Sequence, residues 1–164
     1  YITTPILMDL LENERNVERI TVMVQKEVAE RMQAQPGDKE YGALSIAVQY
    51  YCDAHVDMIV PPSCFLPRPK VDSAVITLQI LPERKVTTTD EALFFRLVKC
   101  AFAQRRKTLL NCLNHQGNFG LSKDTLADLI RSLGWDERIR GETLSISDFA
   151  RLTDAVAQAI SSHM

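Results

Sequence analysis

The spacing of apolar residues changes character about halfway along the chain. In the first half, short β-branched runs typical of strands alternate with segments that have helical spacing. The predicted elements are a helix from Thr3 that ends within 13–16, a strand at 19–25, helices at 26–35 and 42–52, and strands at 54–60 and 71–81. The apolar face of the first helix is assigned to Ile6 and Leu10, with Leu7 and Leu11 as further candidates.

This order of elements predicts an α/β sheet in residues 1–82. The strand at 19–25 is rich in Ile and Val and is expected to be buried before the chain crosses to a helix. The last two strands are joined by a non-helical loop, which predicts an antiparallel hairpin at one edge of the sheet. Three strands are too few to close on themselves. The segment is therefore expected to be the carboxy-terminal part of a doubly wound domain whose front half is missing.

The second half shows helical spacing throughout. A polar stretch at 82–89 ends in a capping-box pattern, Thr88 followed by Glu91, and we expect the domain boundary there. An apolar stripe then runs along 94–102 and is expected to continue through Leu113 as one helical face. The remaining predicted helix limits are a Ser122 cap, a Gly134 stop and a Ser147 cap. Residues 83–160 are thus expected to form a small all-α domain, and Ser161–Met164 resembles a cloning-vector remnant.

The loop between the last two predicted strands is unusually stiff. It holds four of the chain's seven prolines, which neither a helix nor a strand ladder is expected to cross. Phe65, Arg68 and Lys70 lie on it, and no acid occurs between Asp57 and Asp72. An aromatic ring beside two cations suits a flat, anionic ligand such as a nucleotide. The alternative is a proline-stapled hairpin in which Phe65 fills the core.

Charge separates the two halves of the chain more clearly than the net charge of −2 suggests. The first 82 residues carry 7 Lys and Arg against 11 Asp and Glu, and the remainder carries 12 against 10. No acid occurs from Ala92 through Lys123, a window that contains Arg105, Arg106 and Lys107 in sequence. On a helix these three consecutive cations would fan over about 200° around the axis, so that at least one leans toward the apolar face. We expect them to contact phosphates of a polyanion. The alternative is an ordinary solvated helix face.

Several kinds of site are not predicted by this sequence. The four cysteines lack the spacing of a zinc site, and we expect free buried thiols in the cytoplasm. Cys64 is a weak candidate nucleophile because nothing marks a histidine base for it. There is no GxGxxG motif and no Walker loop, so neither a cofactor site nor a metal site is assigned to this chain. No apolar run approaches the ~18 residues that cross a membrane.

Six motifs together resemble one known family, the small-subunit ribosomal RNA adenine N6-dimethyltransferases, or KsgA family. They span nearly the whole chain, from Tyr1 to about Ile160. The motifs are Gln25–Arg31, Tyr41–Ser45, Val60–Phe65, Pro69–Val75, Phe102–Thr108 and Gly141–Ser145. The resemblance implies a Rossmann-like methyltransferase domain that ends near residue 82, followed by a helical rRNA-binding domain at 83–160.

The resemblance also implies an activity and a division of roles. The family uses S-adenosylmethionine to dimethylate two adjacent adenines near the 3′ end of small-subunit rRNA during ribosome biogenesis. Its glycine-rich cofactor motif is expected upstream of this chain, and Tyr1 is expected beside its catalytic Asn-Leu-Pro-Tyr motif. Phe65 matches the family's second base-stacking aromatic, and the Arg105–Lys107 run resembles its rRNA-contacting helix. The chain would therefore contact rRNA and the assembling small subunit, but would be inactive without its amino-terminal half.

Two other functions stay open at this stage. A non-catalytic RNA-binding or ribosome-assembly module would use the Arg105–Lys107 run and keep Phe65 in the core. A large-subunit rRNA adenine methylase of the antibiotic-resistance type would share the proline-rich loop. The substantial helical domain and the motif at 102–107 favour the small-subunit enzymes over this second alternative.

Overall fold

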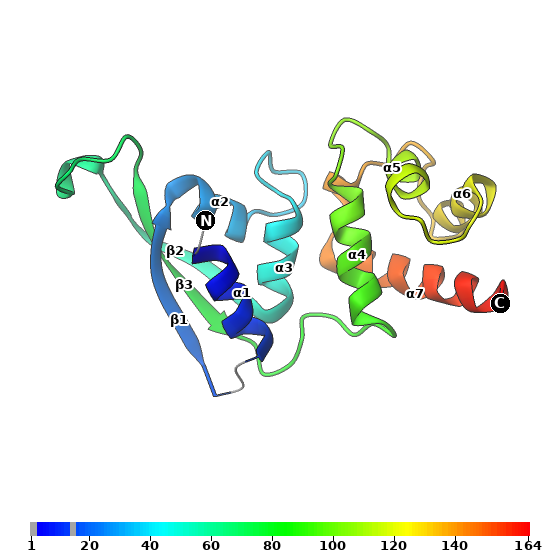
Figure 1. The fold of residues 1–164 in the computed structure, drawn as a ribbon, viewed down its shortest axis with the longest axis horizontal. Helices are drawn as coiled ribbons and strands as arrows, with labels where there is room; N and C mark the ends of the chain where they lie inside the picture. The colour runs from blue at the N-terminus through cyan, green and yellow to red at the C-terminus, as the bar shows by residue number, and fades with distance from the viewer. Residues whose placement is uncertain (1–2, 14–15) are drawn as a thin grey trace. The chain divides into compact units, whose positions relative to one another are not determined.

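The computed structural model describes residues 3–13 and 16–164 (Figure 1). The chain forms two compact units. The first runs to Gln35 and resumes from Lys39 to Lys85, and the second comprises Pro36–Asp38 and Val86–Met164. Within the described residues, the structure contains no helix that is both long and apolar enough to cross a membrane.

The first unit contains a three-stranded sheet in the order β1-β3-β2. Its strands are β1 (Arg19–Gln25), β2 (Cys52–Val60) and β3 (Ser73–Ile80). Both pairings are antiparallel, with Val22 and Val56 each opposite Ile76. The predicted hairpin between the last two strands is confirmed, and β3 is also the central strand because it pairs with β1. A register shift between Val56 and Met58 marks a bulge in β2.

Three helices cover one face of this sheet (Figure 1). They are α1 (Thr3–Asn13), α2 (Lys26–Gln33) and α3 (Ala43–Tyr51). The sheet residues beneath them alternate along the strands, as the two-residue period of a strand requires. The buried residues of β1 and β3 are Ile20, Val24, Ala74, Ile76 and Leu78, and Cys52 is buried at the start of β2.

Two predictions about burial in this unit are wrong. β1 is only half buried, and Met23 on its other side is 50% exposed, because the described helices lie on one face only. In α1 the buried residues are Leu7 and Leu11, while Ile6 is 52% exposed. Leu10 is half-buried. The helical period allowed two faces, and packing against α3 selected the one with Leu7 and Leu11.

Two buried polar side chains of α3 satisfy the end of α2. Ser45 donates its hydroxyl to the carbonyl oxygen of Arg31. Gln49 donates its amide to the carbonyls of Met32 (2.9 Å) and Ala34 (2.8 Å). The last carbonyls of a helix have no partner within it, so these bonds remove a penalty that burial would otherwise impose. They fix α2, which begins where β1 ends.

The second unit is a helical bundle. Its helices are α4 (Glu91–Ala101), α5 (Leu109–Gln116), α6 (Lys123–Ser132) and α7 (Ile146–Ser162), with a short 3₁₀ helix, η2 (Gly141–Thr143), before α7. The core is built from apolar residues at helical spacing on each helix. Its most buried large members are Phe94, Leu97, Leu109, Leu113, Ile130, Phe149, Leu152 and Val156.

The helix limits in this unit correct three predictions. The single stripe through Leu113 is wrong, because α4 ends at Ala101 and Thr108 caps a new helix, accepting the N–H of Asn111. Asp90, rather than Thr88, caps α4. Ser145, rather than Ser147, caps α7.

The other two predicted limits hold. Ser122 caps α6, and Gly134, which follows it, has a φ of +86°. A left-handed conformation of this kind ends helices and favours glycine.

Candidate nucleic-acid interface

The proline-rich loop at 61–72 projects from the end of the sheet between β2 and β3 (Figure 1). It includes one turn of 3₁₀ helix, η1 (Pro62–Cys64), which the sequence did not predict. Pro62 stands at the first helical position, where a backbone N–H would have no partner within the helix, so its missing N–H costs no hydrogen bond. The turn is closed by bonds from Cys64 N–H to the Pro61 carbonyl (3.1 Å) and from Phe65 N–H to the Pro62 carbonyl (3.2 Å).

The side chains of this loop point largely into solvent. Phe65 is half-buried and is not part of the buried core, so the alternative in which it fills the core does not describe this structure. Arg68 and Lys70 are exposed. Leu66, at the tip, is 99% exposed. Tyr1, the other residue expected near the target base, lies outside the described residues.

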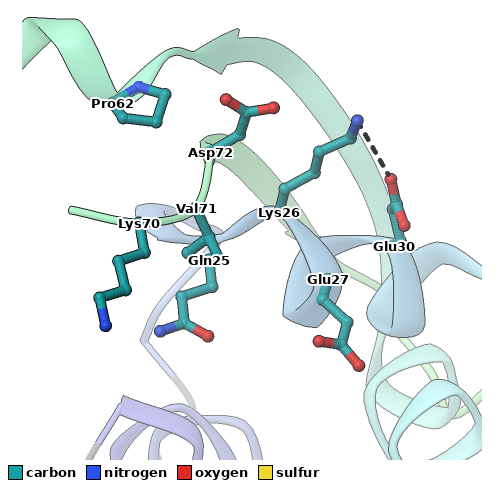
Figure 2. Close-up of a pocket in the computed structure, with 8 residues that line it drawn as sticks. All are labelled: Gln25, Lys26, Glu27, Glu30, Pro62, Lys70, Val71 and Asp72. Atoms are coloured by element: carbon teal, nitrogen blue, oxygen red, sulfur yellow. Dashed lines mark ion pairs between the residues drawn. The ribbon is translucent and has the colours of Figure 1, made fainter.

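A hollow of about 410 Å³ lies beside the loop (Figure 2). It is located at the carboxyl end of β1, and its lining comes from α2 and from both ends of the loop. The lining residues are Gln25, Lys26, Glu27, Glu30, Pro62, Lys70, Val71 and Asp72. Lys26 is 3.9 Å from Glu30, the ion pair drawn in Figure 2. The backbone N–H of Lys26 donates to the Asp72 carbonyl (3.0 Å), which ties the start of α2 to the end of the loop.

The predicted cations of the second unit lie in a turn and not on a helix. Arg105, Arg106 and Lys107 are all exposed within the segment that connects α4 to α5, which we call the basic turn. The prediction that they fan across a helix is therefore wrong. The N–H of Lys107 donates to the Gln104 carbonyl (3.0 Å), which closes the turn.

The basic turn is attached to a segment more than thirty residues later in the sequence. Arg140 donates from Nη2 to the carbonyl oxygen of Arg106 (2.9 Å), and the N–H of Leu109 donates to the Ile139 carbonyl (2.8 Å). Arg140 therefore adds its charge to those of the basic turn, and we call the four residues together the basic surface. The sequence placed Arg140 in a connector only, because nothing local indicates this long-range contact.

Another cation of the acid-free window has a structural role instead. Arg96 donates to the carbonyls of Gly117 (2.5 Å) and Asn118 (2.9 Å), and its guanidinium lies 4.5 Å from the ring centre of Phe119. These contacts hold the loop between α5 and α6. A Cβ on Gly117 would come within 1.9 Å of the Phe119 ring, so this close packing requires glycine.

The sequence predicted that all four thiols are buried, but one of them is exposed in the structure. Cys52, Cys100 and Cys112 are free and buried, but Cys64 is free and exposed on the proline-rich loop. Burial raises the pKa of Cys52 to about 12 and that of Cys100 to about 11. Burial raises the pKa of Cys112 as well. The described residues contain no cluster of three or more His, Cys, Asp or Glu side chains that could hold a metal ion.

Two solved structures have a similar fold. A dimethyladenosine transferase from Plasmodium falciparum superposes with a TM-score of 0.78 and 26% identity, over 92% of this chain and 61% of that one. The 23S rRNA methyltransferase ErmE superposes with a TM-score of 0.66 and 19% identity, over 96% of this chain and 62% of that one. The chain thus has the mixed α/β fold of this class of methyltransferases.

The chain belongs to the ribosomal RNA adenine dimethylase family, whose model matches residues 1–151. Proteins named ribosomal RNA small subunit methyltransferase A are among its relatives. That of Alkaliphilus metalliredigens is 54% identical over 96% of this chain, and that of Clostridioides difficile is 51% identical over 99%. The chain spans about half the length of these relatives, 54% and 55% respectively.

Proposed function

We propose that this chain is the target-base and rRNA-contacting part of an enzyme that dimethylates two adjacent adenines of small-subunit rRNA. The donor would be S-adenosylmethionine, and the setting would be ribosome assembly in the cytoplasm. Residues 1–82 would complete a Rossmann-like methyltransferase domain, and residues 83–160 would form the rRNA-binding domain. The observation that carries the proposal is the exposed basic turn in a chain of this family.

Phe65 is proposed to stack on the target adenine. Enzymes that modify a base in RNA or DNA remove it from its stack and hold it against aromatic rings. The half-exposed ring of Phe65, on a loop stiffened by four prolines, suits this role. Arg68 and Lys70 on the same loop would neutralise neighbouring phosphates. Positioning of the amine against the methyl donor would supply much of the rate.

The basic turn is proposed to contact the rRNA backbone. Arg105, Arg106 and Lys107 are exposed, and Arg140 is bonded to the Arg106 carbonyl, so four cations lie on one surface. Contacts of this kind give affinity that falls steeply with salt and fix the register of the RNA without reading its sequence.

No cofactor contact is assigned to this chain. In doubly wound domains the nucleotide lies on a glycine-rich turn between a strand and a helix. Among the described residues, β1 passes directly into α2 and β2 passes into the proline-rich loop, and neither junction contains a glycine. The S-adenosylmethionine site and the catalytic Asn-Leu-Pro-Tyr motif are therefore proposed to lie in a preceding segment, and the chain is proposed to be inactive alone.

Calorimetric titration tests the cofactor assignment. S-adenosylmethionine is expected to show no saturable binding to this chain. Micromolar binding would contradict the assignment.

A second experiment mixes the chain with the amino-terminal half of the Alkaliphilus metalliredigens relative and measures methyl transfer to small-subunit rRNA. Activity is expected only in the mixture, and Phe65→Ala is expected to abolish it.

A second candidate is a non-catalytic RNA-binding module, which the exposed basic surface alone would also support. The two functions predict different results when the chain is mixed with the amino-terminal half, because only the enzyme would transfer methyl groups. RNA binding without methyl transfer, by a mixture in which both parts are folded, would favour the module. A large-subunit rRNA methylase is a weaker alternative. It would transfer methyl groups to large-subunit rRNA in the same assay.

The RNA contacts are tested by replacing the basic turn with alanines. Arg105→Ala/Arg106→Ala/Lys107→Ala is expected to weaken rRNA affinity and to reduce the slope of log affinity against log salt by roughly two to three, since each lost phosphate contact removes nearly one. An unchanged slope would remove the basic turn from the interface. Lys123→Ala, at an exposed cation in α6, serves as the matched control.

A further inference from the structure

Folding places a carboxylate inside the basic surface. The sequence around the basic turn is free of acids, but Glu142 approaches it from η2. Its Oε2 is 3.7 Å from Nη2 of Arg105, and its Oε1 is 3.3 Å from Nη1 of Arg140. One carboxylate therefore contacts two arginines that lie 35 residues apart in the sequence.

The backbone of Glu142 is fixed from several sides. The preceding Gly141 packs so closely on the end of α4 that a Cβ there would lie 3.0 Å from the Ala101 side chain. The carbonyl of Glu142 accepts the N–H of Gly37 (3.1 Å). The hydroxyl of Thr143 donates to the Arg140 carbonyl (2.8 Å). These contacts fix the backbone that carries the carboxylate, and the Glu142 side chain is 32% exposed.

Two roles are compatible with an acid at this place. As a countercharge, it would weaken the attraction of the basic surface for phosphates. As an organiser, it would hold two long side chains that otherwise lose rotamer freedom when RNA binds. Exposed ion pairs contribute little to folding stability, so stability alone gives a weak reason for the arrangement.

The geometry favours the second role. The carboxylate accepts a hydrogen bond from Arg140 (3.3 Å) and forms an ion pair with Arg105 (3.7 Å), and Arg140 donates a further hydrogen bond to the Arg106 carbonyl. The Arg105 and Arg140 side chains are each 45% exposed, so both remain accessible to a phosphate. We propose that Glu142 is a positioning residue that holds Arg105 and Arg140 at a fixed separation for neighbouring phosphates of an RNA backbone. This inference rests on the RNA binding proposed above.

The direction in which one substitution changes the RNA affinity separates the two roles. Glu142→Gln keeps the shape of the side chain and removes one negative charge. A countercharge role predicts tighter RNA binding. The positioning role predicts weaker binding, roughly three- to tenfold, the size expected for coupled neighbouring residues. The measurement is the anisotropy of a labelled hairpin RNA with two adjacent adenines in its loop, titrated with the 164-residue chain at several salt concentrations.

Glu137→Gln is the matched control. Glu137 is also an exposed acid in the second unit, and it pairs with Arg131 (2.6 Å), which is not one of the four cations of the basic surface. This variant loses the same charge and is expected to bind RNA as tightly as the unsubstituted chain or more tightly. Equal or tighter binding by Glu142→Gln would overturn the inference.

A double-mutant cycle tests whether Glu142 acts through the two arginines. In the Arg105→Ala/Arg140→Ala background, Glu142→Gln is expected to cause no further weakening. A further loss of affinity there, with thermal unfolding unchanged, would overturn the inference. If the triple-alanine variant of the basic turn binds as the unsubstituted chain does, the RNA-binding proposal itself fails. If that variant is weakened but Glu142→Gln binds more tightly, only the positioning role fails.

Discussion

The roles of single residues here depend on contacts that are distant in sequence. Arg96, Arg105 and Arg140 are chemically equivalent, yet the first is bonded to a loop and the other two share the carboxylate of Glu142. The sequence identified the acid-free window correctly, but it could not separate a structural arginine from an accessible one. The deciding partners of Arg96 are backbone carbonyl groups, which every residue carries, so no residue pattern indicates them.

The four cysteines give a prediction at the same scale. Thiolate is the reactive form, so a buried thiol with a raised pKa reacts slowly, and an exposed thiol reacts fast. In native protein near pH 8, about one thiol per chain is expected to react rapidly with a disulfide reagent, and the other three only after unfolding. Stopped-flow absorbance would measure the two phases.

The Cys64→Ser variant is the control for this experiment. It is expected to lose the fast phase and to keep the slow one. A fast phase that persists in this variant would show that one of Cys52, Cys100 or Cys112 is accessible, contrary to their burial.

Helix limits show what local sequence can and cannot determine at the scale of the element. The order of the helices and strands followed from apolar spacing, except that α4 and α5 were predicted as one helical stripe. The start of α7 did not, because Ser145 and Ser147 both precede an apolar run. Buried Leu144 and Ile146 place the chain so that Ser145, and not Ser147, faces the free N–H groups of the first turn.

The cap of α7 is therefore testable with a matched pair of variants. Ser145 accepts the N–H of Asp148 (3.1 Å), and Asp148 accepts the N–H of Ser145 in return (3.0 Å). Ser145→Ala is expected to lower the free energy of unfolding by about 1 kcal/mol. Ser147→Ala, at an exposed position inside the helix, is expected to leave it nearly unchanged. Urea unfolding of both variants would measure the difference, and equal losses would contradict the assignment of the cap.

The break between α4 and α5 has a consequence for the basic turn at this scale. A continuous helix would have spread Arg105, Arg106 and Lys107 around its axis. The cap at Thr108 instead leaves the basic turn as a loop that Arg140 and Glu142 can reach. Apolar spacing continued across the break, which is why the sequence predicted one stripe.

The whole molecule should lose stability at alkaline pH, for a reason that both units share. Cys52 in the first unit and Cys100 in the second have pKa values raised by burial to about 12 and about 11, above the ordinary value of 9.0. The folded chain therefore keeps these protons at a pH where the unfolded chain releases them. Their contribution is fully present below about pH 9 and is lost as pH rises through the folded values.

Urea unfolding at a series of pH values would measure this loss. The free energy of unfolding is expected to fall between about pH 9 and pH 11, with a slope of up to about 1.4 kcal/mol per pH unit for each buried thiol. Cys52→Ala is expected to flatten the fall, and Cys64→Ala is expected to leave it unchanged. A fall that is as steep in Cys52→Ala as in the unsubstituted chain would exclude Cys52 as its cause.

The sequence by itself determined the order of the elements, apart from the break between α4 and α5, as well as the change from α/β to all-α and the family. These follow from spacing and from motifs, which are properties of neighbouring residues. The tertiary structure alone decided which face of α1 is buried, that β1 is half exposed, and that Glu142 lies between Arg105 and Arg140. The physical reason is that burial and ion pairing depend on what lies opposite a side chain, and the opposite partner comes from a distant part of the chain.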